Sequence, residues 1–189
     1  MSYQNSHIGK VYYHVMKGSR YILADERNKK KLLDTVFHIY RENRWRMYAF
    51  CVTDDSAHFM AEAETYQAVR RETGRACDEF FQRCGEKIPH VGGIVPGLCG
   101  CGYRELDSPW KAACCSRYIH RLPLEEGYAA RPEDYWWSSY NTYAGNYEWE
   151  QVDCRMVLQF FSLNPEKARK KLVFYTCGSI IENESFLKK

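Results

Sequence analysis

The first group that could perform chemistry is His58, which lies in a segment with strict alternation. The alternation predicts a strand over Ser56–Glu64, with His58 and Glu62 on one face and small apolar residues on the other. An imidazole together with carboxylate oxygens can hold a divalent cation. A lone histidine on a strand is more often structural, so this face predicts a metal site only if further ligands join it.

The second group is Tyr118, which lies in an expected helix between Arg117 and Arg121. A tyrosine can attack phosphorus and form a phosphotyrosine link when a metal and basic groups neutralise the developing charge. With fifteen tyrosines in the chain, a structural role is the alternative for any single one.

Cysteine pairs and an aromatic cluster are the remaining candidates. The spacing of the cysteines differs from the C-x2-C pattern of zinc sites, which favours small buried thiols. The aromatic residues can stack unpaired bases or fill the core under the helix that carries Tyr118. The cysteines are Cys99, Cys101, Cys114 and Cys115, and the aromatic residues are Tyr135, Trp136, Trp137, Tyr140 and Tyr143.

Hydrophobic periodicity predicts the elements that position these groups. Asp25 and Thr65 have the side chains of N-caps, and Pro123 is expected to end the third helix near Leu122. The glycine-rich stretch Pro89–Gly102 predicts a loop or irregular hairpin. The expected strands are Lys10–Gly18, Trp45–Thr53 and Ser56–Glu64, and the expected helices are Glu26–Asn43, Thr65–Cys84 and one starting at Asp107, followed by two short helical patterns after Asp153.

This order predicts an α+β fold, a ferredoxin-like sandwich with an antiparallel sheet and helices on one face. The sequence divides into a domain over 1–150 and a short helical C-terminal tail over 151–189. Its 189 residues have a net charge of +3, which is too small to indicate a nucleic-acid partner by itself. No apolar run approaches ~18 residues, so no membrane span is expected. Nine cysteines without a secretory signal favour reduced thiols and a cytoplasmic protein.

Three segments together resemble one protein family. The segments are YYHVMKGSRYILADE, YAFCVTDDSAHFMAE and RYIHRLPLEEGYAARPEDYWWSSYNTYAG, and the resemblance extends from about Lys10 to Gly145. They are similar, in order, to the single-tyrosine HUH transposases, in particular the branch of REP-associated tyrosine transposases. The third segment is the most specific of the three.

The resemblance implies a protein that recognises hairpins in single-stranded DNA. Members of the family cut beside the hairpin with a tyrosine and Mg²⁺ or Mn²⁺, stay attached to a 5′-phosphate and rejoin the strand. Two histidines on the third strand and a polar side chain one turn after the tyrosine hold the metal. Some relatives are homodimers in which the tyrosine helix of one subunit serves the other, so a homodimer is one expected state.

Carried onto this sequence, the resemblance places the nucleophile at Tyr118 and the second histidine at His58. The first histidine position holds Ser56, and the polar position after the tyrosine holds Leu122. A serine hydroxyl is a poor Mg²⁺ ligand and leucine has no lone pair, so two of three ligands are missing. The carboxylates of Asp55 and Glu62 are the candidate substitutes.

The degraded ligand set predicts lost or reduced catalysis in a protein that still binds DNA. The alternatives are an active transposase, a binding-only domesticated relative, an RNA-binding ferredoxin-like module and a decaying protein without a biochemical role. The DNA-binding candidates are Arg117, Arg121, Lys30, Arg71 and Trp136.

Overall fold

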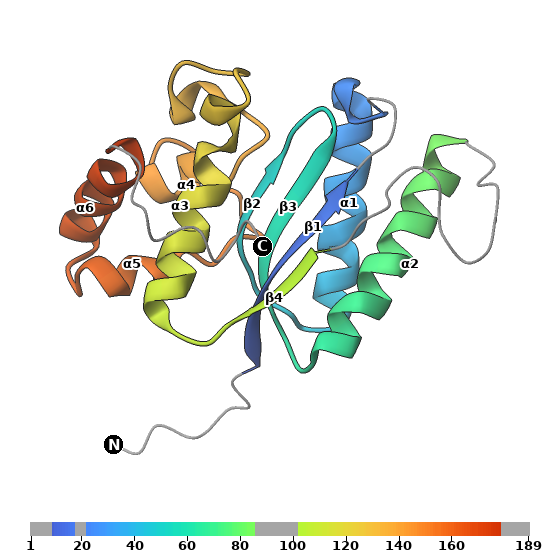
Figure 1. Ribbon diagram of the computed structural model, residues 1–189, viewed down its shortest axis with the longest axis horizontal. Coiled ribbons are helices and arrows are strands. Elements are labelled where there is room, and N and C mark those ends of the chain that lie inside the picture. Colours follow the sequence, from blue (N-terminus) through green and yellow to red (C-terminus); the bar gives the residue numbers. More distant parts are fainter. Residues whose placement is uncertain (1–8, 18–21, 86–101, 179–189) are drawn as a thin grey trace.

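Four antiparallel strands form a sheet that carries helices on both of its faces (Figure 1). The computed structural model describes residues 9–17, 22–85 and 102–178. The strand order β2-β3-β1-β4, with α1 and α2 between strands, is that of the ferredoxin-like fold. The α+β class and the antiparallel sheet expected from the sequence are confirmed. The elements are β1 (Lys10–Lys17), a 3₁₀ turn (Ile22–Ala24), α1 (Glu26–Glu42), β2 (Met47–Val52), β3 (Ser56–Ala63), α2 (Tyr66–Cys84), β4 (Gly102–Leu106), α3 (Pro109–Glu125), a second 3₁₀ turn (Pro132–Asp134), α4 (Tyr140–Ala144), α5 (Arg155–Phe161) and α6 (Pro165–Cys177).

Local signals set the helix starts where the sequence predicts them. The carboxylate of Asp25 accepts a hydrogen bond from the backbone N–H of Arg27 at 2.9 Å, and the hydroxyl of Thr65 accepts one from that of Ala68 at 3.1 Å. Each bond satisfies an N–H that has no partner inside the helix. Gly85 ends α2 at φ 73°, a left-handed conformation that glycine adopts without strain.

The two faces of the sheet are covered by different helices, which corrects the expectation of helices on one face only. On one face, His14 and Phe59 stack at 5.3 Å between ring centroids, and Tyr40 of α1 bonds to His14 at 2.6 Å. On the other face, the ring of Tyr118 of α3 contacts His58 of β3. Figure 1 shows α1 and α2 on one side of the sheet and α3 to α6 on the other.

Helix α3 continues past the proline that was expected to end it. Pro123 lies inside the last turn, and the helix runs to Glu125. Pro123 has no N–H to donate, but the following turn still closes, since the N–H of Glu126 forms a hydrogen bond to the carbonyl of Leu122 at 2.9 Å. The pocket described below therefore gains Glu125 and Glu126 at its rim.

The segment 151–189 contains the two expected helices, α5 and α6, within its described part. Val157, Leu158, Ala168 and Leu172 are buried in the same hydrophobic core as the sheet. The helices therefore pack against the rest of the fold. Within the described ranges, no helix is long and apolar enough to cross a membrane.

Most of the stretch Pro89–Gly102 lies outside the described residues. Gly102 begins β4, where the sequence predicted only an irregular strand region without defined bounds. Val15 of β1 pairs with Gly102, so β4 forms the sheet edge next to β1.

Gly74 is exposed in the middle of α2, and a Cβ built there meets nothing within 4 Å. We expect Gly74→Ala to raise the free energy of unfolding by about 0.5–1 kcal/mol, because alanine loses less backbone entropy on folding. Urea unfolding measures this change. Gly85→Ala is the matched control and should lower stability, since its left-handed φ penalises a side chain.

Candidate functional site

A pocket of about 590 Å³ lies between α3 and the sheet face that carries His58. Its floor is aromatic and its rim is charged. The volume falls in the range of small-ligand sites. The lining includes Tyr13, Ser56, His58, Tyr118 and Leu122, with Lys17, Asp55, Arg104, Glu125 and Glu126 among the charged residues.

Three rings from β1, β3 and α3 meet in this pocket. The centroids of Tyr13, His58 and Tyr118 are each 6.0 Å from the other two. The register of β1 against β3 brings Tyr13 and His58 together. Val15 lies opposite His58, and Tyr13, two residues before Val15, lies on the same face of the sheet. The structure thus brings together the two residues to which the sequence assigned chemistry, His58 and Tyr118.

Both ring nitrogens of His58 are engaged by neighbouring hydroxyls. Nδ1 lies 2.8 Å from the hydroxyl of Tyr13, and Nε2 lies 3.0 Å from that of Ser56. The chain of hydrogen bonds continues from Ser56 to the hydroxyl of Thr53 at 2.9 Å, and from Thr53 to the carboxylate of Asp55 at 3.1 Å. A neutral imidazole satisfies both contacts, accepting at one nitrogen and donating at the other.

Burial controls the protonation of the groups in the pocket. It lowers the pKa of His58 to about 3, so the ring is neutral at pH 7. Burial also raises the pKa of Tyr118 above its usual value, although a hydrogen bond with Tyr13 opposes the shift. A raised pKa disfavours the phenolate, which is the form of tyrosine that attacks phosphorus most readily.

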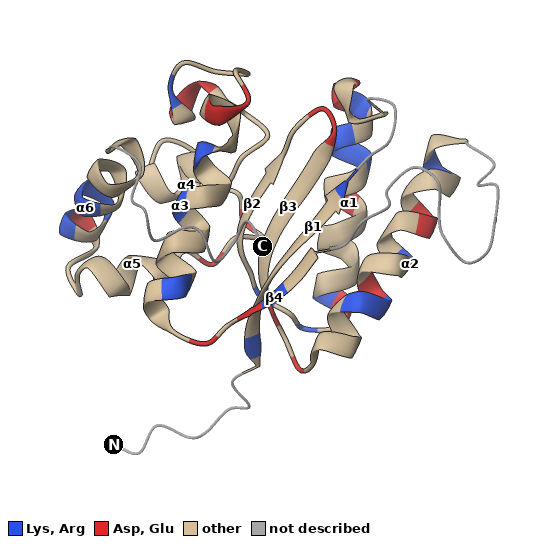
Figure 2. Cartoon of the chain, viewed as in Figure 1, with Lys and Arg blue, Asp and Glu red and all other residues tan. Residues whose placement is uncertain are grey.

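The rim of the pocket is acidic next to Tyr118. Burial, followed by repulsion from Asp55, raises the pKa of the Glu126 carboxyl. Figure 2 shows the corresponding red segments at the β2–β3 turn and after α3. Lys17 and Arg104 line the same pocket from β1 and β4. An anionic strand entering the pocket therefore meets carboxylates as well as two cations.

The residues at the expected ligand positions do not fit Mg²⁺ or Mn²⁺. Leu122 is buried and presents carbon only, and the hydroxyl of Ser56 is shared between His58 and Thr53. Both nitrogens of His58 are already in hydrogen bonds. Across the described ranges, no three histidine, cysteine, aspartate or glutamate side chains are grouped so that they could hold a metal ion.

The two candidate substitutes for the missing ligands lie in different places. Asp55 lines the pocket, where it accepts the bond from Thr53. Glu62 is held near the other end of β3, by the hydroxyl of Tyr48 at 2.7 Å and the N–H of Gly9 at 2.9 Å. Glu62 therefore does not share the pocket with His58.

The arginines beside Tyr118 bind the protein's own backbone. Arg117 is 1% exposed and donates to the carbonyls of Tyr175 at 2.8 Å and Gly178 at 2.9 Å. Arg121 donates to the carbonyl of Thr176 at 2.9 Å. These side chains hold the C-terminal end of α6, as cations at a helix C-terminus favourably do.

The remaining DNA-binding candidates are exposed but lie apart from the pocket. Lys30 pairs with Asp34, and Arg71 pairs with Glu72, in the helix layer on the opposite sheet face. Trp136 is 49% exposed and packs on Tyr147, with 4.5 Å between ring centroids.

Two tyrosines of the aromatic cluster lie in the core, and two of the four candidate cysteines are buried. Tyr140 and Tyr143 are core residues whose rings pack on His120 of α3. Cys114 and Cys115 are buried in α3, and Cys99 and Cys101 lie outside the described residues.

Sequence reasoning missed several residues of the pocket, among them Tyr13 and Glu126. Tyr13 can be recognised as a pocket residue only once the register of β1 against β3 is known. Glu126 was missed because Pro123 was expected to end the helix before it.

No protein-family model and no curated protein matches the chain. One similar solved structure is that of a REP-associated tyrosine transposase bound to a REP hairpin, with a TM-score of 0.60, 13% sequence identity, and coverage of 81% of this chain and 98% of that chain. The chain has the fold of this transposase. The crystal structure of a candidate transposase from Deinococcus radiodurans matches with a TM-score of 0.41 and 22% identity, over 59% of this chain and 91% of that one.

Proposed function

We propose that this chain is a DNA-binding protein of the tyrosine-transposase type that binds single-stranded DNA hairpins without metal-dependent cleavage. The observation that carries the proposal is the meeting of Tyr118 and His58 in one pocket, 6.0 Å apart between ring centroids. The resemblance in sequence places the nucleophile and a metal histidine at these two residues. The fold it shares with a hairpin-bound transposase supports the same assignment.

Three features of the pocket support loss of cleavage. The donor set around His58 lacks two ligands, at Ser56 and Leu122. Burial raises the pKa of Tyr118 and so disfavours its phenolate. The carboxylates of Asp55, Glu125 and Glu126 at the rim oppose the approach of a phosphodiester.

An RNA-binding ferredoxin-like module is the weaker alternative. Such modules stack bases on an open face of the sheet. Here α1 and α2 cover one face, and α3 lies over the face that carries Tyr13 and His58. The sheet therefore offers no open aromatic platform among the described residues.

We expect wild-type protein and Tyr118→Phe to behave alike toward a labelled single-stranded DNA hairpin in Mn²⁺. Neither should form a covalent adduct on a denaturing protein gel, and both should retard the DNA on a native gel. The substitution removes one hydroxyl and keeps the ring. A covalent band with the wild-type protein that is absent with Tyr118→Phe would show that cleavage survives.

A further inference from the structure

Helix α6 is held in one orientation by contacts with α3 and α4. Arg169 donates to the carbonyl of Tyr143 at 2.8 Å, and Arg117 and Arg121 of α3 bind the carbonyls at the C-terminal end of α6. Ala168 and Leu172, one turn apart, are buried against the core. These contacts fix which side of α6 faces outward.

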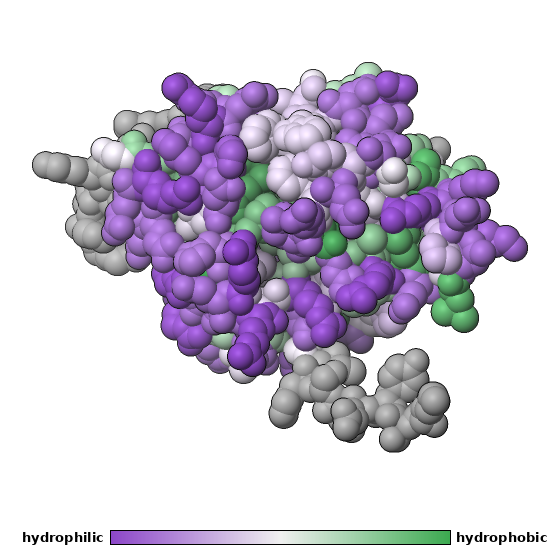
Figure 3. All heavy atoms as spheres, turned by 180° about the vertical axis from the view of Figure 1, so that it is seen from behind, coloured by the Kyte–Doolittle hydropathy of each residue, from purple (hydrophilic) through white to green (hydrophobic). Residues whose placement is uncertain are grey.

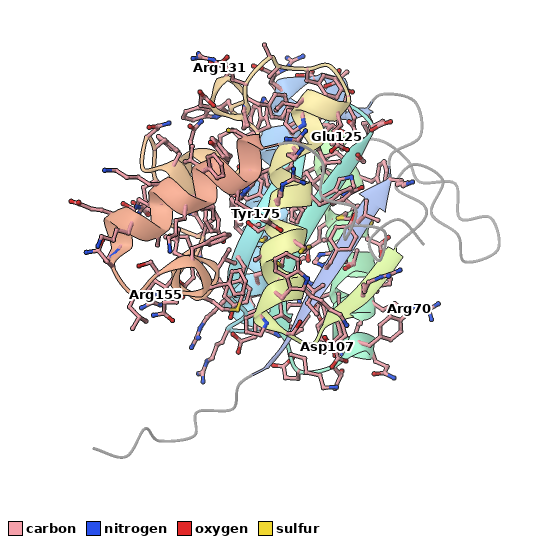
Figure 4. The ribbon with its side chains drawn as sticks, turned by 60° about the vertical axis from the view of Figure 1, so that its left-hand side comes forward. Arg70, Asp107, Glu125, Arg131, Arg155 and Tyr175 are labelled. Carbon is pink, nitrogen blue, oxygen red and sulfur yellow. The ribbon has the colours of Figure 1, made fainter. Side chains whose placement is uncertain are left out.

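The outward side of α6 is basic and carries one exposed aromatic ring. Lys167, Lys170 and Lys171 are exposed, and Phe174 is 82% exposed. Positions i, i+3, i+4 and i+7 lie on one face of a helix, so these four side chains form a single surface, the α6 face. Figure 2 shows the blue segments of α6, and Figure 4 shows nitrogen-tipped side chains projecting from it away from α3.

The α6 face has an excess of positive charge. The helix carries four cationic side chains against one carboxylate, Glu166. Within the described part of the chain, none of the three lysines forms an ion pair, and Lys171 donates to the carbonyl of Phe161 at 3.2 Å. By contrast, many surface cations elsewhere are paired, as Lys111 is with Asp107 and Arg131 with Asp134.

An exposed phenylalanine among lysines suits a ligand that has both charge and flat apolar surface. Figure 3 shows hydrophobic beside hydrophilic atoms at the edge of the molecule formed by α5 and α6. A single-stranded polynucleotide presents phosphates and unpaired bases, which bind lysines and stack on aromatic rings. Lys167 and Lys171 are separated by about 6 Å along the helix axis. The three ammonium groups therefore lie close enough together to contact neighbouring phosphates of one strand.

We propose that the α6 face is a DNA contact surface, in which Lys167, Lys170 and Lys171 bind the phosphate backbone and Phe174 stacks an unpaired base. The inference rests on the proposed function and adds a binding surface that lies outside the pocket. The pocket sets three carboxylates against the two cations Lys17 and Arg104, so further attraction for the DNA strand has to come from another part of the protein. Helix α6 lies beside α3, which forms one wall of the pocket. In this proposal a strand that leaves the pocket passes over α3 to the α6 face.

The test compares three full-length variants with the wild-type protein by fluorescence anisotropy, on a DNA hairpin with a single-stranded flank. Lys167→Gln/Lys170→Gln/Lys171→Gln should weaken binding at least tenfold. It should also lower the slope of log affinity against log salt by about 2, because each phosphate contact contributes about 0.7–0.9. Phe174→Ala should weaken binding of the flanked hairpin about tenfold and leave a blunt hairpin unaffected.

A matched control removes the same charge from the opposite helix layer. Arg41→Gln/Arg44→Asn/Arg70→Gln replaces three exposed cations of the α1–α2 side, with asparagine chosen at position 44 because the backbone φ there is 58°. Its salt slope should equal that of the wild type. Unchanged thermal unfolding of each variant confirms that the exposed substitutions leave the fold intact.

Each alternative result contradicts the proposal in a different way. Equal losses of DNA affinity in both triple variants would indicate a general effect of net charge. That result would overturn the assignment of DNA binding to the α6 face. Unchanged DNA affinity with reduced self-association of Phe174→Ala would assign the face to a second copy of the chain. No binding of any hairpin by the wild-type protein would overturn the proposed function and this inference together.

Discussion

We expect the protein to lose about 4–6 kcal/mol of unfolding free energy between pH 7.5 and pH 5. His14, His58 and His120 are each at most 5% exposed, and burial lowers the pKa of each from 6.5 to about 3. Below pH 6.5 the unfolded chain binds protons at these residues that the folded chain excludes. Each histidine therefore removes about 1.4 kcal/mol per pH unit between pH 6.5 and 3.

The loss is comparable with the whole stability of a typical domain, so acid unfolding should be complete before pH 4. Urea unfolding at pH 7.5, 6 and 5 measures the slope. His120→Gln should reduce the slope of unfolding free energy against pH by about 1.4 kcal/mol per pH unit, which corresponds to one proton. The reason is that the ring of His120 is 0% exposed within α3. A stability that is constant from pH 7.5 to 5 would contradict the burial of these three rings.

Replacing Arg117 by methionine should lower the free energy of unfolding by about 3 kcal/mol. Arg117→Met keeps the aliphatic stem and deletes the charged hydrogen bonds to the carbonyls of Tyr175 and Gly178. It also removes the guanidinium that lies 5.4 Å from the centroid of the Tyr175 ring. The C-terminal end of α6 then loses its bonds to Arg117 and is held to α3 by Arg121.

Arg131→Met is the matched control, because the Arg131 side chain is 65% exposed and its ion pair with Asp134 is a surface pair. Its expected loss is under about 1 kcal/mol. Chemical denaturation compares the two variants, and hydrogen exchange in α6 shows whether the loss begins there. Equal stabilities of the two variants would contradict the anchoring role of Arg117.

Local patterns explain why the hairpin of β2 and β3 and the starts of α1 and α2 were predictable. Alternation in Ser56–Ala63 identified the face of His58, and the N-caps Asp25 and Thr65 act within a few residues of themselves. Such signals need no knowledge of the rest of the chain. The predicted end of α3 was wrong. Proline was expected to stop the helix, whereas Pro123 lies inside its last turn.

Contacts between distant segments were beyond the sequence. The partnership of Tyr13 with His58 depends on the register of β1 against β3. The arginines beside Tyr118 looked like phosphate ligands, since nothing local shows that α6 returns to offer them its terminal carbonyls. The packing of α6 on α3 also leaves the lysines of α6 exposed.

The most direct test of the account is the affinity of the wild-type protein for a DNA hairpin in EDTA. The DNA is a labelled single strand from sequence flanking its own gene, compared with a permuted strand of equal composition that forms no hairpin. We predict at least tenfold tighter binding of the hairpin, unchanged when Mn²⁺ replaces EDTA, and no covalent product. Equal affinity for the two strands, or binding that requires Mn²⁺ and yields an adduct through Tyr118, would contradict the account.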